Sequence, residues 1–578
     1  MQPARSGENR AVIAVAAAVM ALTLVPYLAA LQLGEPGEVF GGFIWGVDDG
    51  NVYLSWIRQA SEGHLLLANQ YTTDPQNPHF FNLFLLFAGL VCRISGLAPI
   101  YVFHGLRLLG GVFMLVSFYW LVSLLTGDRW VRWAALGLTA LGSGLGWVVV
   151  LADEAGARLG LHPVDVGVNW QVQPEAVTFL SALLNPLFIT SMGLICLTLG
   201  HALIALERKR LRPALLSGVL LLILGNIHSY DIFAIHATLG VWIIYGLMTR
   251  RYSLRTAAAT YAVIFAVSAP APLWSYWAAN QDPSYLVKAM TPTPSAGFVN
   301  YLIGYGLLAV FAIAGAIQTL PPGPSSMGRE ENGNALGPGL LRFAVFWALA
   351  NSAVLGLPVS FQRKLVEGLH MPVAILAGVG VVYLARLVTS RAAAAGKLQT
   401  VKERMALTVV AALVICLPSN ALLVSQCLEN VKTNNELLLH VLAPPIYLSA
   451  DYADAASWLA EHTTAEDVVL SSSLFGSYLP ATAPCKVYVG HWAETLDFVG
   501  KLRQVRRFYD AASGAEERLA LLATRLAPDY VVVGPYEGLM GGSYGTSPVL
   551  DEATAGFLEP VFTSGNVTVL RANLHGYQ

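Results

Sequence analysis

Long apolar runs are the feature of this sequence that most restricts its fold. Stretches of about 20 apolar residues recur as far as about Ser425, and each can cross the roughly 30 Å hydrocarbon core of a bilayer as a helix. Only 12% of the residues are charged, whereas soluble domains carry about a quarter. The sequence therefore predicts a polytopic α-helical membrane protein.

The apolar runs predict eleven transmembrane helices with one consistent orientation. Segments rich in Lys and Arg fall alternately on one side, and the positive-inside rule makes that side cytoplasmic, together with the N-terminus. This scheme requires that the apolar stretch from Phe80 to Ile94 does not cross, so we expect an interfacial or re-entrant helix there. The predicted spans cover residues 11–33, 101–125, 133–151, 186–206, 213–228, 231–249, 256–277, 298–318, 340–357, 370–389 and 405–425.

The first apolar run follows Arg5 and Arg10, an arrangement that is also typical of a secretory signal peptide. The run is longer than the apolar core of such a peptide and lacks a clear A-x-A cleavage site, so we predict an uncleaved first span. We expect the chain to reside in a bacterial-type inner membrane as a multi-pass protein.

The sequence changes character after the last apolar run, which predicts two domains. Residues 1–425 form the transmembrane module, with a large first outer loop at 34–100 that carries juxtamembrane helices. In residues 426–578, short β-branched runs alternate with amphipathic stretches, the pattern of an extracytoplasmic α/β domain. Its predicted strands are Asp467–Leu470, Lys486–Val489 and Asp529–Val533, followed by a hairpin at Val561–Val569.

Charge and cysteine content exclude two classes of function. The net charge is −2 and no basic face or RNA-binding module is present, so we expect no nucleic-acid partner. The five cysteines include no CxxC pair, which indicates neither a zinc site nor a disulfide framework.

Two adjacent carboxylates stand out in the first outer loop, in the segment GVDDGNVYLSW at residues 46–56. Asp48 and Asp49 precede an amphipathic stretch from Asn51 to Ala60, so the pair can simply favour a helix N-terminus. One acid suffices for that role. Two adjacent carboxylates aimed at one site would instead raise each other's pKa or hold a divalent cation, and either property suits a general base.

A second polar cluster interrupts two apolar runs for only a few residues. It contains His228, Tyr230 and Asp231. A tight outer turn explains some polarity there, but it does not require these three side chains together.

A third polar cluster contains Arg363, Lys364, Glu367 and His370. In a helix, spacings of three and four residues put Arg363, Glu367 and His370 on one face. The cluster can be an ion pair that satisfies itself at a helix end. Alternatively, Arg363 or Lys364 can bind a phosphate group, for which the planar guanidinium offers bidentate contact.

Two further charged residues are predicted at the outer boundary of the membrane. Arg107, just inside the second span, can extend outward to water or join Arg363 and Lys364 in a cationic cradle for a lipid phosphate. Glu175 can line the same site or only cap a short helix before the fourth span, which we expect to begin at Asn185 and Pro186.

This layout resembles the GT-C membrane glycosyltransferases, which include protein O-mannosyltransferases and lipid A aminoarabinose transferases. In that superfamily the first span leads into a large outer loop with an acidic motif and two juxtamembrane helices. The similarity covers the whole chain in architecture, and the acidic motif is its recognisable catalytic element. The matching parts are Asp48–Asp49, the helix from Asn51, the segment Pro78–Gly96, Gly144–Trp147, Pro174–Glu175 and the α/β tail.

The resemblance implies transfer of a sugar from a polyprenyl phosphate in the outer leaflet to an extracytoplasmic acceptor. Arg107, Arg363 or Lys364 would hold the donor phosphate, and Asp48 or Asp49 would deprotonate the acceptor hydroxyl for in-line attack with inversion. The remaining candidates, predicted to contact substrate, are Glu175, His228, Tyr230, Asp231, Glu367, His370, His491 and Trp492.

The last two candidates lie in the segment Gly490–Asp497, at the end of a predicted strand, where loops of parallel sheets often bind ligands. Trp492 is expected either to stack on a sugar ring beside His491 and Glu494 or to be a buried aromatic under the loop.

A divalent cation, Mg²⁺ or Mn²⁺, is a possible cofactor, but one Asp–Asp pair is a thin ligand set unless Glu175 or Asp231 contributes. Two other classes of function stay open. A flippase or transporter of a lipid-linked glycan would also need many spans and cationic residues, although the polar clusters gather at one surface and no internal repeat is visible. A non-catalytic assembly protein would use the tail for recognition.

Overall fold

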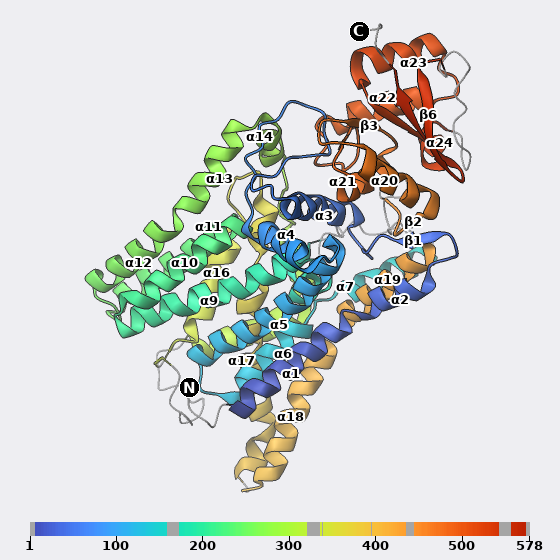
Figure 1. Cartoon of the computed structure of the whole chain (residues 1–578). Helices are drawn as coiled ribbons and strands as arrows, with labels where there is room; N and C mark the ends of the chain where they lie inside the picture. The colour runs from blue at the N-terminus through green and yellow to red at the C-terminus, as the bar shows by residue number, and fades with distance from the viewer. Residues whose placement is uncertain are drawn as a thin grey trace. The chain divides into compact units, whose positions relative to one another are not determined.

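The structure is a computed structural model of the whole chain (Figure 1). It describes residues 6–158, 173–320, 336–337, 339–394, 396–434, 444–542 and 556–573.

The chain folds into two compact units, each assembled from separate stretches of sequence. The helical unit takes its residues from Met1–Leu24, His104–Tyr276 and Thr291–Ser425, and the α/β unit from Val25–Phe103, Trp277–Met290 and Gln426–Gln578. The α/β unit therefore combines the whole predicted first outer loop and the segment Trp277–Met290 with the carboxy-terminal region, and each unit is described by itself below.

Long apolar helices make up most of the chain before Ser425. Among the described residues, seven helices are long and apolar enough to cross a membrane, or nine if each of two bent pairs counts as one span. The seven are α1 with α2 (Ser6–Leu22, Val25–Leu33), α5 (Pro99–Leu125), α9 (Pro186–Arg208), α11 (Asp231–Met248), α12 with α13 (Leu254–Ser268, Pro270–Gln281), α15 (Phe298–Thr319) and α17 (His370–Ala394) with the preceding turn.

All eleven predicted spans coincide with helical segments, but they differ in length. The bent pairs are α6 with α7 (Arg129–Leu141, Gly146–Arg158) and α18 with α19 (Leu398–Ile415, Pro418–Thr433). Two further helices are shorter: α10 (Leu211–Ile227) has 17 residues, near the lower limit for a span, and α16 (Arg342–Val354) has 13. The polytopic helical class is confirmed, and the described residues hold seven to nine full-length spans where eleven are predicted.

The predicted start of the fourth span is confirmed in detail. Asn185 is the N-cap of α9, its side chain accepts a hydrogen bond from the backbone N–H of Leu187 at 2.9 Å, and Pro186 occupies the first turn. Pro is favoured there because the missing N–H would have no helical partner. The short helix α8 (Thr178–Leu184) precedes this cap.

The α/β unit contains a five-stranded sheet with strand order β4-β3-β5-β7-β6. Strands β4, β3 and β5 are parallel, and β7 and β6 continue the sheet as an antiparallel hairpin. The predicted strands and hairpin are thereby confirmed. The strands are β3 (Val468–Leu470), β4 (Lys486–Val487), β5 (Tyr530–Val533), β6 (Leu558–Ser564) and β7 (Val567–Ala572).

Helices accompany this sheet along the chain, in the order typical of an α/β fold. The core between sheet and helices includes Val531 of β5 and Val505 and Phe508 of α22, all fully buried. The helices are α20 (Ala450–His462), α21 (Ser473–Thr482), α22 (Phe498–Tyr509), α23 (Ala515–Leu521) and α24 (Pro535–Met540), and a separate strand pair joins β1 (Glu38–Phe40) to β2 (Tyr447–Ser449).

The first loop contributes α3 (Val47–Glu62) and α4 (Leu83–Ser95) to the α/β unit. The backbone of α4 packs directly against a side chain of α3. A Cβ atom added at Gly89 of α4 would lie only 2.4 Å from the Cβ of Ala60 in α3. The helix expected at Phe80–Ile94 is thus present as α4 and holds α3 in place. Its position relative to lipid stays a prediction.

Candidate functional site

The opening aspartate pair lies in the first turn of α3. Gly46 is the N-cap of this helix, with φ 60° and ψ 44°, and no side chain caps it. A glycine suits this left-handed conformation, because other residues are strained there. Asp48 and Asp49 follow inside the helix, so neither is the N-cap, although both are favoured there by the helix dipole.

His491 brings the carboxy-terminal region to these aspartates. Its Nε2 lies 3.2 Å from Oδ1 of Asp49 and 3.6 Å from Oδ2 of Asp48, and the first contact joins residues 442 positions apart. Its Nδ1 accepts hydrogen bonds from the backbone N–H groups of Ala493 at 3.1 Å and Glu494 at 3.2 Å. In the neutral ring the proton is therefore on Nε2, which donates to Asp49.

The loop that carries His491 follows β4 and is fixed from both sides. The backbone N–H of Gly490 donates to Oγ1 of Thr495 at 3.1 Å, and the same hydroxyl donates to the carbonyl of Tyr71 at 2.8 Å. The site thus lies beyond the carboxyl end of a parallel strand, as the sequence predicts for this loop.

The two aspartates differ in environment. The side chain of Asp48 is 20% exposed and that of Asp49 is 73% exposed. Burial, and next the negative charge of Asp49, raise the pKa of Asp48 above its usual range, although His491 acts in the opposite direction. Asp48 therefore holds a proton more tightly than an exposed aspartate.

Burial of the ring by itself lowers the pKa of His491. The hydrogen bond to Asp49 and the charges of Asp49, Asp48 and Glu494 outweigh this effect, so the pKa lies above the usual value. A second ring proton would sit on Nδ1 and displace its two backbone donors. The neutral form with hydrogen on Nε2 is therefore the one that fits the observed contacts.

Other polar and aromatic groups border this pair within the α/β unit. Glu494 forms an ion pair with Lys288 of α14 (Pro283–Met290), and the Lys288 ammonium lies 4.7 Å from the ring centroid of Trp56. Lys288 and Trp56 are not among the predicted site residues, because nothing in the sequence connects residues 278–297, between the predicted spans 256–277 and 298–318, with α3. Trp492 is 55% exposed beside His491, with 5.8 Å between ring centroids. The expectation of a buried aromatic is wrong for this residue.

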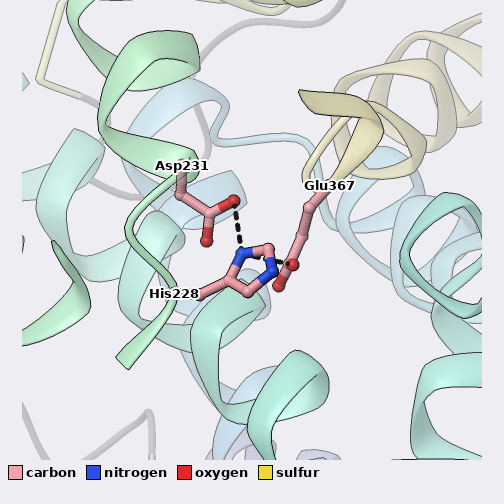
Figure 2. Close-up of side chains that lie close together, drawn as sticks. All are labelled: His228, Asp231 and Glu367. Carbon is pink, nitrogen blue, oxygen red and sulfur yellow. Dashed lines mark ion pairs between the residues drawn. The ribbon is translucent and has the colours of Figure 1, made fainter. Parts of the chain in front are cut away.

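A second cluster lies in the helical unit and joins two of the predicted groups (Figure 2). Nδ1 of His228 lies 3.1 Å from Oδ1 of Asp231 and 2.9 Å from Oε2 of Glu367. His228 is the C-cap of α10 and Asp231 begins α11, so the polar turn predicted between these helices is present. The side chains are 6%, 1% and 0% exposed in the same order. We call these three residues the His228 cluster.

The predicted common face of Arg363, Glu367 and His370 is not present. A 3-10 helix covers Gln362–Val366, Glu367 has non-helical backbone with φ −55° and ψ 133°, and Gly368 has φ 89°, so no continuous helix joins the three residues. This break turns Glu367 toward His228. His370 begins α17, where its Nδ1 lies 2.8 Å from Oγ1 of Thr178.

The three predicted phosphate-binding cations have different surroundings. Arg107 is fully buried, and its Nη1 donates at 2.9 Å to both Thr23 Oγ1 and the carbonyl of Ala182, so the expectation that it extends to water is wrong. Lys364 donates to Oη of Tyr230 at 3.5 Å. The backbone N–H of Arg363 donates to a loop carbonyl at 2.8 Å.

Glu175 lies in the 3-10 helix Pro174–Ala176 and is 3% exposed. Its charge interacts electrostatically with Lys364 and with Glu367, so Glu175 lies near the third predicted cluster. Among the described residues, the group of three or more His, Cys, Asp or Glu with metal-ligand proximity is the His228 cluster. Asp231 thus lies with His228 and Glu367, whereas Asp48 and Asp49 belong to the other unit.

Comparisons with known proteins give fold similarity at low sequence identity. No protein-family model matches the chain, and no curated protein matches its sequence. The oligosaccharyltransferase of Archaeoglobus fulgidus in its apo form matches with a TM-score of 0.55 and 12% identity, over 92% of this chain and 70% of that one. The chain shares its fold with this oligosaccharyltransferase.

Two further structures are similar. The archaeal oligosaccharyltransferase AglB from Archaeoglobus fulgidus, in complex with an inhibitory peptide and a dolichol-phosphate, matches with a TM-score of 0.52 and 12% identity, over 94% of this chain and 72% of that one. ArnT from Cupriavidus metallidurans bound to undecaprenyl phosphate matches with a TM-score of 0.47 and 15% identity, over 96% and 98%. The GT-C resemblance of the sequence is thereby confirmed at the level of the fold.

Proposed function

We propose that the chain is an integral-membrane glycosyltransferase that moves a sugar from a polyprenyl-phosphate donor to an extracytoplasmic acceptor. The observation that carries this proposal is the contact of Asp48 and Asp49 with His491, in a chain with the GT-C fold. The structurally similar AglB, which was solved with a dolichol-phosphate, supports a lipid phosphate as the donor class.

In this proposal Asp48 is the general base. Its raised pKa makes it a stronger proton acceptor than an exposed aspartate, which suits proton abstraction near neutral pH. The acceptor hydroxyl gives its proton to the Asp48 carboxylate, its oxygen bonds to the anomeric carbon, and the bond from that carbon to the phosphate oxygen breaks. Attack in line with the leaving phosphate inverts the configuration.

The neighbours of Asp48 have supporting roles in the same proposal. Asp49 raises the proton affinity of Asp48 through its charge, and His491 fixes Asp49 through the Nε2–H donor. Arg363 and Lys364 remain our candidates for binding the donor phosphate, on the basis of charge. Arg107 is a weaker candidate, because it already donates to Thr23 and Ala182.

The direct test incubates the purified protein in lipid with a panel of polyprenyl-phosphate sugars and candidate acceptors. We expect mass spectrometry to detect glycosylated acceptor and released polyprenyl phosphate with one of the donors. If the protein neither binds nor consumes any donor, the proposal is wrong. Movement of intact lipid-linked glycan across the bilayer, without bond cleavage, would indicate a flippase instead.

The pH dependence of turnover identifies the base. Because the pKa of Asp48 is raised, the base form is present above that pKa and is lost as pH falls through it. Replacing Asp49 by Asn removes a negative charge beside Asp48 and lowers the pKa of Asp48, so the acid limb of kcat should move to lower pH. Asp454→Asn, an exposed aspartate in α20, should leave the limb in place. Loss of turnover at every pH in Asp49→Asn would make Asp49 the base.

We propose that the exposed ring of Trp492 stacks on a sugar of the substrate. We expect Trp492→Ala to raise KM for the preferred substrate by about 2- to 10-fold with little change in kcat, the range expected for one aromatic contact. Trp492→Phe should retain most of the affinity, because it keeps an aromatic face. Equal KM values for all three proteins would exclude stacking.

A further inference from the structure

The His228 cluster contains more buried negative charge than its hydrogen bonds can satisfy. Both carboxylates approach the same ring nitrogen, Nδ1 of His228, at 3.1 Å for Asp231 and 2.9 Å for Glu367. That nitrogen carries at most one hydrogen, which can point well at only one oxygen. Among the described residues, none of the four carboxylate oxygens has a partner in hydrogen-bond geometry, and neither does Nδ1.

Two ionised carboxylates in this arrangement are unfavourable unless a proton or a bound cation compensates their charge. Two carboxylates that are 1% and 0% exposed have lost their hydration, and buried charges are retained when they are paired or bind metal. The aromatic rings around the imidazole do not supply a charge. Phe188 and Tyr230 pack edge-on against His228, with ring centroids at 5.6 and 5.3 Å, and so fix the direction of Nδ1.

The spacing of the ligand atoms fits one divalent ion. The three atoms lie within 4.8 Å of one another. Ligands bound at about 2.1 Å from a metal are about 3.0 Å apart at octahedral corners and about 3.4 Å apart at tetrahedral ones. The two measured separations from Nδ1 agree with the octahedral value. A neutral imidazole and two carboxylates carry two negative charges, which one divalent cation balances.

We propose that His228, Asp231 and Glu367 bind one divalent transition-metal ion. A set of one imidazole nitrogen and two carboxylate oxygens suits Mn²⁺, Fe²⁺ or Zn²⁺ better than the all-oxygen preference of Mg²⁺ or Ca²⁺. Three protein ligands leave positions open for water or a substrate oxygen. The proposal is independent of the transferase chemistry assigned to Asp48, since it concerns other residues.

The test uses Mn²⁺ as the probe. The full-length protein in lipid nanodiscs is stripped with a chelator and titrated with Mn²⁺, and the loss of the free six-line EPR signal measures binding. We expect one ion per chain, and pulsed EPR should detect the coupling of one imidazole ¹⁴N to the bound ion. Zn²⁺ should displace Mn²⁺.

Variants then locate the ion. Asp231→Asn, Glu367→Gln and His228→Gln should each weaken Mn²⁺ binding by at least about 10- to 100-fold, and His228→Gln should also remove the ¹⁴N coupling. His236→Gln, a change of another histidine on α11, should leave both readouts unchanged. The double variant Asp48→Asn/Asp49→Asn should lose transferase activity but still bind one Mn²⁺.

Three results would overturn the proposal, and they do not depend on the transferase assay. The first is wild-type protein that binds no Mn²⁺. The second is a bound ion without imidazole coupling, a measurement that needs no folded variant. The third is Mn²⁺ binding that disappears with the Asp48 and Asp49 pair but persists without Glu367.

Discussion

Replacing Asp48 by Asn should lower the rate of sugar transfer by about 10²- to 10⁴-fold, the contribution typical of a positioned general base. Asn keeps the size of the side chain but cannot accept the proton of the acceptor hydroxyl. It also removes the carboxyl group whose pKa is raised by burial and by the charge of Asp49. The rate is measured as product per minute by mass spectrometry, with donor and acceptor above their KM values.

If the same substitution acted by disturbing the structure, the effect would appear in donor binding and in thermal stability. We expect Asp48→Asn to bind donor lipid with wild-type affinity and to unfold thermally at nearly the wild-type temperature. Asp454→Asn, which removes an exposed carboxylate from α20, serves as the matched control and should keep full activity. Wild-type turnover in Asp48→Asn would contradict the assignment, and unchanged lipid translocation with no chemistry in either protein would favour a flippase.

Local sequence patterns predict most of the elements because they report burial along one segment. Apolar length locates the helices, and β-branched runs locate the strands of the α/β unit, down to the hairpin of β6 and β7. The shortness of α16 is harder to foresee, since its 13 residues lie in a longer apolar run that continues past the end of the helix. The hydropathy of a segment reflects its affinity for lipid and does not show where its helix begins or ends.

Such local patterns do not predict that Asp49 and His491 come into contact. Each residue can be predicted as a site candidate by itself, one from an acidic motif and the other from its place after a strand. Their contact, however, joins positions that are 442 residues apart in the sequence. No periodicity in either segment encodes which loops come together. The same applies to Lys288, whose partner Glu494 lies 206 residues away.

The predicted common helical face of Arg363, Glu367 and His370 is absent for a local reason that is visible in the sequence. Spacings of three and four residues favour a common helical face, but Gly368 lies between Glu367 and His370 and adopts φ 89°. A glycine inside a helical pattern is a possible break, because only glycine accepts this conformation without strain. Reading Gly368 as a break would have separated Glu367 from His370.

Replacing Gly476 by Ala should destabilise the α/β unit and reduce activity together. Gly476 lies in α21, where an added Cβ would be 2.1 Å from the carbonyl oxygen of Val489, just before the loop that carries His491. A backbone oxygen cannot rotate away as a side chain can. We expect a loss of about 1–3 kcal/mol in unfolding free energy, and a thermal midpoint lower by about 2–10 °C.

Activity links this packing to the site, because moving Val489 also moves His491 away from Asp49. Gly476→Val should have a larger effect than Gly476→Ala on both the thermal midpoint and the rate of sugar transfer. Gly514→Ala, in the same unit, is the control, since a Cβ there meets no atom within 4 Å. If Gly476→Ala unfolds at the wild-type temperature, α21 does not fix the loop. If it is destabilised but fully active, the position of His491 does not limit the reaction.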